Sequence, residues 1–193
     1  MLAIGVRDKG PYKALAIREA LAWRVEELGR GAAQMFQQDD MASAILLSRG
    51  VVECAAVMAR VVEVVAGRAA MKEADLHDAL TSMLSGSKSD SDFPQAINVA
   101  TYLKHLEKRI EGVSRVYDHL SEYAHPNWGG VSLLFSRIDY DQYITYFGKF
   151  EGRTDGARMH ALNALVGGLE IFDFEYNRLA DVIKDWLPEL EQL

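Results

Sequence analysis

The sequence predicts an all-α protein, an antiparallel bundle of four to six helices with a small β-hairpin insertion around residues 131–147. Apolar residues recur at three- and four-residue spacing, which is typical of helices with one buried face, over 12–37, 41–66, 95–125 and 155–186. Strand composition is confined to VSLLFSRI and QYITYF, two β-branched and aromatic stretches on either side of Asp139-Tyr140-Asp141. This balance of patterns indicates a helical core that carries one hairpin.

The first three helices are bounded by residues that commonly begin or end helices. Pro11 suits a first helical turn, Asp39 and Asp40 are candidate N-caps, and Gly67 is a plausible stop. Beyond these helices the chain is rich in serine and aspartate and has no apolar period, which indicates a loop. The expected segments are helices at 12–37, 41–66 and 72–84, then an internal loop at 85–94.

The segment 95–125 has the most regular pattern, and we predict one unbroken helix that Pro94 opens. Its apolar residues alternate in steps of four and three, a heptad-like seam made of Val99, Leu103, Leu106, Ile110, Val113, Tyr117, Leu120 and Ala124. Such a seam is typical of the central helix of a bundle, and it also suits a dimer interface.

The last helix is predicted over 155–186, with Pro188 ending it. Gly167-Gly168 interrupts its pattern and predicts either a kink or a close approach to another helix, because two glycines lower helix propensity. We expect a single helical-bundle domain over 1–193, with the loop at 85–94 and a hairpin insertion at 129–153.

Composition limits the classes of function. The net charge of −7 and pI of about 5.2 argue against broad electrostatic capture of nucleic acid. The single cysteine, Cys54, lies in an apolar helical run and is expected to be a buried, unreactive thiol. The N-terminal residues lack the pattern of a signal peptide, and no apolar run reaches the roughly 20 residues that span a bilayer. We therefore expect a cytoplasmic bacterial protein without a membrane partner.

Polar chemistry is concentrated in LSEYAHPNWGG, at the predicted end of the segment 95–125. Ser121 and His125 are four residues apart, so they share one helix face beside Tyr117, and Asn127 follows in the turn. His125 either caps the helix C-terminus, where the helix dipole favours a cation, or presents an imidazole to a site.

A second polar pair, Arg49 and Glu53, lies next to the apolar stripe of the segment 41–66. The pair either forms a surface ion-pair ladder or needs buried partners, because the surrounding ILLSRGVVECAAV has few other polar positions. Under the second interpretation, Arg49, Glu53, Ser121 and His125 meet in one polar cluster that includes Tyr117 and Asn127.

These two motifs resemble those of a bacterial family of abortive-infection-type proteins grouped with the HEPN superfamily. The shared pattern, which covers about 40–130, is Arg-x-x-x-Glu followed by Leu-Ser-x-x-x-His-Pro, here at Arg49, Glu53, Leu120, Ser121, His125 and Pro126. The resemblance implies an all-helical bundle with a defence-associated or toxin–antitoxin role. Catalytic members resemble one another through an arginine and a histidine separated by four to six residues. Arg153 and His160 have this spacing, but a predicted helix start lies between them. The signature is therefore missing.

No metal or cofactor is expected. Glu122-x-x-His125 has the spacing found in di-iron bundles, but those sites need two such motifs and further glutamates. Phosphate-binding loops and nucleophile elbows are also missing. The aromatic residues around the hairpin either stack on bases or cover the end of the bundle; they are Trp128, Phe135, Tyr140, Tyr143, Tyr146 and Phe147.

Two functional hypotheses follow. One is a non-catalytic binding or regulatory bundle, and the acidic pI and the missing signature favour it. The alternative is a metal-independent RNA-directed enzyme, in which His125 would move a proton and Arg49 would hold a phosphate of an RNA or nucleotide ligand. A homodimer is expected in either case, because two long amphipathic faces and an aromatic hairpin present more apolar surface than one chain buries.

Overall fold

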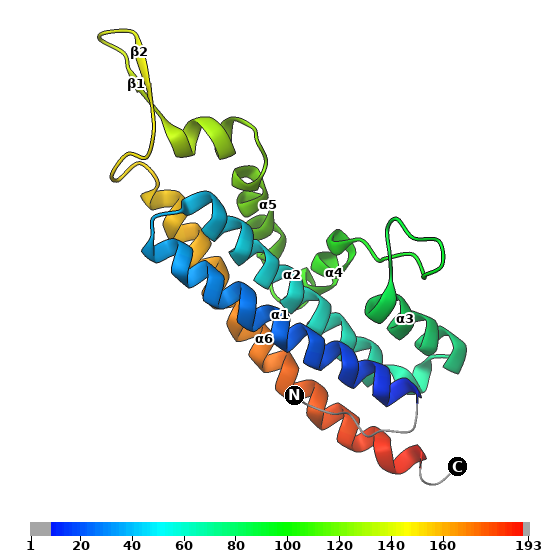
Figure 1. Ribbon diagram of the computed structural model, residues 1–193. Helices are drawn as coiled ribbons and strands as arrows, with labels where there is room; N and C mark the ends of the chain where they lie inside the picture. The colour runs from blue at the N-terminus through cyan, green and yellow to red at the C-terminus, as the bar shows by residue number, and fades with distance from the viewer. Residues whose placement is uncertain (1–8, 191–193) are drawn as a thin grey trace. The chain divides into compact units, whose positions relative to one another are not determined.

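The computed structural model describes residues 9–190, with side chains described as far as Trp186. It is a helical protein with one antiparallel hairpin, so the predicted fold class is confirmed (Figure 1). The expectation that the N-terminus carries no leader falls mainly on residues 1–8, outside the described residues. In chain order the elements are α1 (Lys9–Gln37), α2 (Met41–Ala66), η1 (Arg68–Ala70), α3 (Glu73–Ser85), α4 (Val99–Glu107), α5 (Val113–Ala124), η2 (Trp128–Leu133), β1 (Ser136–Asp139), β2 (Ile144–Phe147) and α6 (Asp155–Leu190).

The chain divides into two compact units, and α1, α2 and α6 each contribute a part to both. Unit 1 comprises 9–24, Glu53–Ile110 and 170–190 within the described residues, and it contains α3 and α4. Unit 2 comprises Val25–Val52 and Glu111–Leu169, and it contains α5, η2 and the hairpin. The expectation of one domain over the whole chain stays a prediction.

The helices α1, α2 and α3 begin and end within a few residues of their predicted bounds. The one continuous helix predicted over 95–125 is wrong, because the chain forms α4 and α5 with a turn between them. Asn98 caps α4, its side chain accepting the N–H of Ala100 at 2.9 Å, so the helix starts four residues later than predicted. Gly112 precedes α5 with φ of 90°, a left-handed conformation that ends any helix before it.

The apolar spacing did not reveal this break, because Leu106 and Val113 keep a seven-residue interval across it. Seam residues on both sides of the break are buried within one chain, which supports the bundle interpretation of the seam. They are Leu103, Leu106, Val113, Tyr117 and Leu120.

The helix α6 runs without interruption through Gly167-Gly168 and on to Leu190, so the predicted stop at Pro188 is wrong. Within unit 2, Gly168 is buried against α2, and a Cβ there would lie 3.2 Å from a methyl group of Val51 and 3.3 Å from one of Val52. Gly167 has nothing within 4 Å of its Cβ position. Of the two alternatives for the glycine pair, the close helix–helix approach is therefore the one observed, and it involves Gly168 alone.

In the hairpin, β1 and β2 pair antiparallel, with Ser136 opposite Phe147 and Asp139 opposite Ile144. The chain enters it through η2, a single-turn π-helix, and the hairpin projects from this end of unit 2 (Figure 1). The tip is closed by Asp139, whose side chain accepts the N–H groups of Asp141 and Gln142 at 3.0 Å each.

The two adjacent glycines offer a direct test of this packing. We expect Gly168→Ala to destabilise the protein by about 1–3 kcal/mol, because the added methyl group overpacks the contact with α2. The matched variant Gly167→Ala is expected to stabilise it by up to about 1 kcal/mol, because alanine is the better helix former and meets no neighbour. Urea denaturation measures both, and equal effects of the two substitutions would contradict the packing.

Candidate functional site

The predicted polar cluster is partly assembled in unit 2, around the buried Tyr117. The Nη2 of Arg49 donates a hydrogen bond of 2.6 Å to the hydroxyl of Tyr117, and its guanidinium carbon lies 4.8 Å from the centre of that ring. The hydroxyl of Ser121 donates to the Tyr117 carbonyl at 2.8 Å, one turn earlier in α5. Arg49 thus contacts the side-chain hydroxyl of Tyr117, and Ser121 contacts its backbone carbonyl.

His125 occupies the C-cap position of α5 through its backbone, and its side chain is exposed, so the choice between its two interpretations stays a prediction. Its extended backbone suits a residue before Pro126, and its N–H donates to the Ser121 carbonyl at 3.1 Å. Asn127 donates to Glu122 at 2.8 Å and accepts the N–H of Gly130 at 3.0 Å. A Cβ at Gly130 would lie only 2.0 Å from the His125 carbonyl oxygen, so this turn requires glycine. Much of the motif therefore shapes the turn into η2.

Glu53 belongs to unit 1, where it lines an open depression with a volume of about 230 Å³. Arg24, Cys54 and Lys88 line it as well. Cys54 is buried, as expected, and burial raises the pKa of its thiol, which disfavours the reactive thiolate. The functional assignment of the predicted site residues stays a prediction.

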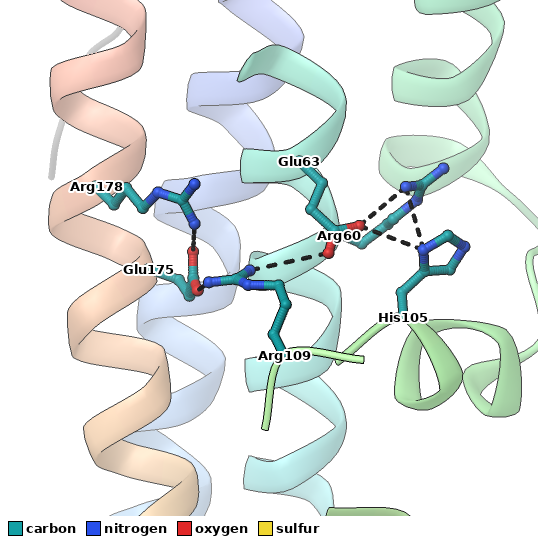
Figure 2. A network of polar contacts seen from close by, with 6 residues as sticks. All are labelled: Arg60, Glu63, His105, Arg109, Glu175 and Arg178. Atoms are coloured by element: carbon teal, nitrogen blue, oxygen red, sulfur yellow. Dashed lines mark hydrogen bonds and ion pairs between the residues drawn. The ribbon is translucent and has the colours of Figure 1, made fainter. Parts of the chain in front are cut away.

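Unit 1 contains a charged network whose buried carboxylate was not anticipated from the sequence (Figure 2). It is centred on Glu175, a fully buried residue of α6. The carboxylate forms an ion pair with Arg109, from the turn after α4, and a second with Nη1 of Arg178 at 3.4 Å. Glu175 comes three residues after Phe172 and four before Leu179, so its position on the apolar face of the last helix was the available signal.

The second carboxylate of the network, Glu63 of α2, binds three basic side chains (Figure 2). Its oxygens lie 3.0 Å from Nη1 of Arg60, 3.3 Å from Nδ1 of His105 and 3.9 Å from Nη1 of Arg109. Arg109 therefore joins Glu63 to the buried Glu175. Because each carboxylate contacts basic side chains from other elements, the contacts indicate a structural connection between α2, α4 and α6 within unit 1.

Two histidines meet in unit 2, where the rings of His119 on α5 and His160 on α6 lie edge to face with centroids 4.3 Å apart. The Nε2 of His119 is buried without a hydrogen-bond partner. Burial lowers the pKa of His119, and the nearby His160 lowers it further, while Glu122 acts in the opposite direction. Both effects favour the neutral form of the His119 imidazole.

The hairpin carries the most exposed aromatic surface of unit 2. Tyr143 at the tip is 93% exposed and has φ of 56°, a left-handed conformation that is costly for a residue with a side chain. The other large hydrophobic residues exposed here are Trp128, Val131, Ile138, Tyr140, Ile144, Tyr146 and Phe147. A two-stranded hairpin has little core of its own, so these side chains contribute little to folding.

Charged residues hold the base of the hairpin to the turn between α1 and α2. Lys149 binds Asp40 at 2.5 Å, and Arg158 pairs with Asp39 and donates to the Phe36 carbonyl at 3.0 Å. Lys149 therefore anchors the base of the hairpin and Arg158 the start of α6, whereas most side chains of the two strands are exposed to solvent. One of the two roles predicted for these aromatic residues is to cover the end of the bundle. Tyr143 does not have that role, because its side chain is exposed.

Neither a family model, nor a curated protein, nor a solved structure matches this chain. Across residues 9–190, histidine, cysteine and carboxylate side chains form no group of three or more that could hold a metal ion. In the same part of the chain, each helix is too short or too polar to cross a membrane.

The buried carboxylate gives a prediction about stability. We expect Glu175→Gln to destabilise the protein by about 1–3 kcal/mol, because the fully buried side chain loses the charge that pairs with Arg109, which then keeps only its longer contact with Glu63. Arg178→Ala is the matched control and should cost no more than about 1 kcal/mol, since its side chain is 40% exposed and its contact is long. Urea denaturation of both variants checks this, and a reversed order would refute the central role of Glu175.

The histidine pair gives a prediction about pH. Because the pKa of His119 is lower in the folded protein, the unfolded chain binds a proton first, and stability falls as the pH drops below about 6.5. We expect His119→Gln to lose less stability than the wild type between about pH 7 and pH 5. His160→Gln removes the smaller of the two causes that lower the pKa of His119. It should therefore reduce the loss of stability by less than His119→Gln does. Thermal unfolding across this pH range is the measurement, and parallel curves for all three proteins would exclude the effect.

Proposed function

We propose that this chain is a non-catalytic binding or regulatory protein whose hairpin docks on the surface of another protein chain. The observation that carries the proposal is Tyr143, which is both almost fully exposed and in a left-handed conformation. Glycine or asparagine would adopt this backbone at lower cost. An aromatic ring placed there at the expense of stability is well suited to inserting into a partner's surface, where tyrosine is enriched among residues that dominate binding.

The chemistry around Tyr143 favours a protein over a nucleic acid. Asp139 and Asp141 lie at the tip of the hairpin, where they would repel a phosphate backbone, and the whole chain has a net charge of −7. The exposed strands combine aromatic and β-branched side chains with few charges, the composition of the buried centre of protein interfaces.

We also propose that the chain works in the cytoplasm as an abortive-infection-type, HEPN-like protein, on the basis of the motifs at Arg49–Glu53 and Ser121–Pro126. The competing proposal is an RNA-directed enzyme that uses His125 with Arg49. Arg49 donates to Tyr117 and is directed to a buried tyrosine, while His125 ends a helix and is exposed. These contacts give more support to binding than to catalysis.

A paired design tests the binding function. A photoreactive phenylalanine derivative at Phe147, which is 77% exposed, is expected to form adducts with a partner chain in the native host. Adding Tyr143→Asn should reduce adduct formation about tenfold or more, because a dominant interface residue is lost. The same substitution should leave thermal stability equal or slightly higher, because asparagine tolerates the left-handed backbone.

The matched control carries the photoreactive residue at Trp23, an exposed aromatic of α1 that is outside the hairpin. Equal adduct yields from Phe147 and Trp23 would contradict the proposal. A yield from Phe147 that Tyr143→Asn leaves unchanged would also contradict it. RNA cleavage by the purified chain that disappears in both Arg49→Ala and His125→Ala would overturn it in favour of the enzyme.

A further inference from the structure

The outer edge of β2 has backbone groups that β1 does not use. Gly148 donates to the Phe135 carbonyl at 2.9 Å, which places this residue pair in a hydrogen-bonded position of the antiparallel ladder. Hydrogen-bonded and non-hydrogen-bonded pairs alternate along such a ladder. The register of β1 and β2 therefore directs the backbone groups of Tyr146 towards β1, and those of Thr145 and Phe147 outwards.

This edge lacks the features that protect exposed strands. β2 reads Ile-Thr-Tyr-Phe and contains neither a charge nor a proline, whereas β1 carries Arg137 and Asp139. All four residues of β2 are exposed. Because an uncharged, exposed edge is a ready template for another strand, β2 is the edge where strand addition is expected.

We propose that the partner on this edge is a second copy of the same chain, whose β2 pairs antiparallel around a two-fold axis at Thr145. The inference rests on the proposed binding function and names the occupant of the hairpin. A two-fold axis perpendicular to an antiparallel pair must relate a residue to itself, and Thr145 has outward backbone groups that can bond to those of its copy. The result is a four-stranded sheet in the order β1-β2-β2-β1.

The side chains of β2 complement themselves in this register. Ile144 lies opposite Tyr146 of the second copy, an aromatic pair with a β-branched residue, and Thr145 lies opposite Thr145. Phe147 ends β2 and approaches Tyr143, the turn residue that directly precedes β2 in the second copy, so the two aromatic residues that are 77% and 93% exposed in one chain lie near each other across the axis. The pairing thus accounts for the exposed rings at both ends of the strand.

Charge supports a second copy over an unrelated strand. An antiparallel pair of β2 strands places the tip of one hairpin, which carries Asp141, near the base of the other, where Lys149 follows β2. Lys149 is about half exposed beside Asp40, so its ammonium group remains accessible to another carboxylate. The dimer therefore brings opposite charges towards each other at both ends of the shared edge, and β2 itself contributes no like charges to it.

Proline substitution tests the edge in the intact chain. Thr145→Pro removes an outward N–H that β1 does not use, so the hairpin should persist, while the symmetric pair loses both bonds at the axis. We expect its dimer dissociation constant to rise roughly tenfold or more relative to Thr145→Val, which keeps the N–H. Light scattering over a dilution series gives the constants, with a mass near twice 21.5 kDa expected for the valine variant at high concentration.

A cysteine at the axis tests the register independently of stability. Thr145→Cys should form a disulfide-linked dimer under mild oxidation, because the residue faces its own copy and the native Cys54 is buried. Ile138→Cys is the matched control, since it pairs with Thr145 on β1, is 47% exposed and lies away from the axis. Cross-linking of Thr145→Cys well above that of the control supports the dimer.

Three results would overturn the inference: a mass near 21.5 kDa at every concentration, equal cross-linking of the two cysteine variants, or equal dissociation constants for proline and valine. A monomer whose photoreactive Phe147 captures a different protein would refute the second copy and leave the proposed binding function standing. A monomer that captures nothing would remove both.

Discussion

The carboxylate of Glu175 is fully buried in unit 1, and its environment constrains the elements around it. A buried charge is tolerated only with a close partner, so Arg109 must reach α6 from the turn that follows α4. Arg109 also meets Glu63 on α2, which gives the turn a fixed place between two helices (Figure 2). The turn between α4 and α5 thus contains Arg109, which forms an ion pair with Glu175 of α6.

Unit 2 is held by a different kind of constraint. The close approach of α6 to α2 depends on the missing side chain of Gly168, and Tyr117 joins α5 to α2 through the guanidinium group of Arg49. The residues that looked most like an active site therefore serve, in part, to place α5 and to shape the turn at Asn127 and Gly130. That turn leads into η2 and so determines where the hairpin leaves the helices.

Function and stability diverge most clearly at the hairpin. Its base is anchored by ion pairs, its strands have apolar side chains that little of the same unit covers, and its tip holds Tyr143 in a costly conformation. A surface arranged in this way gains free energy mainly by meeting another surface. The uncharged edge of β2 is the surface for the second copy proposed above, and it links the proposed binding role to self-association.

The sequence by itself determined the helical class, the helices α1, α2 and α3, and the position of the hairpin, because each depends on local periodicity and on capping residues. Three features became clear only in the tertiary structure, because the spacing of apolar residues does not change at them. They are the break before Gly112, the burial of Glu175 and the close contact with α2 that requires glycine at Gly168 but not at Gly167. These depend on which neighbour lies within a few ångströms. One-dimensional spacing records which face of a helix is apolar, but the packing partner of that face is set by residues far away in the chain.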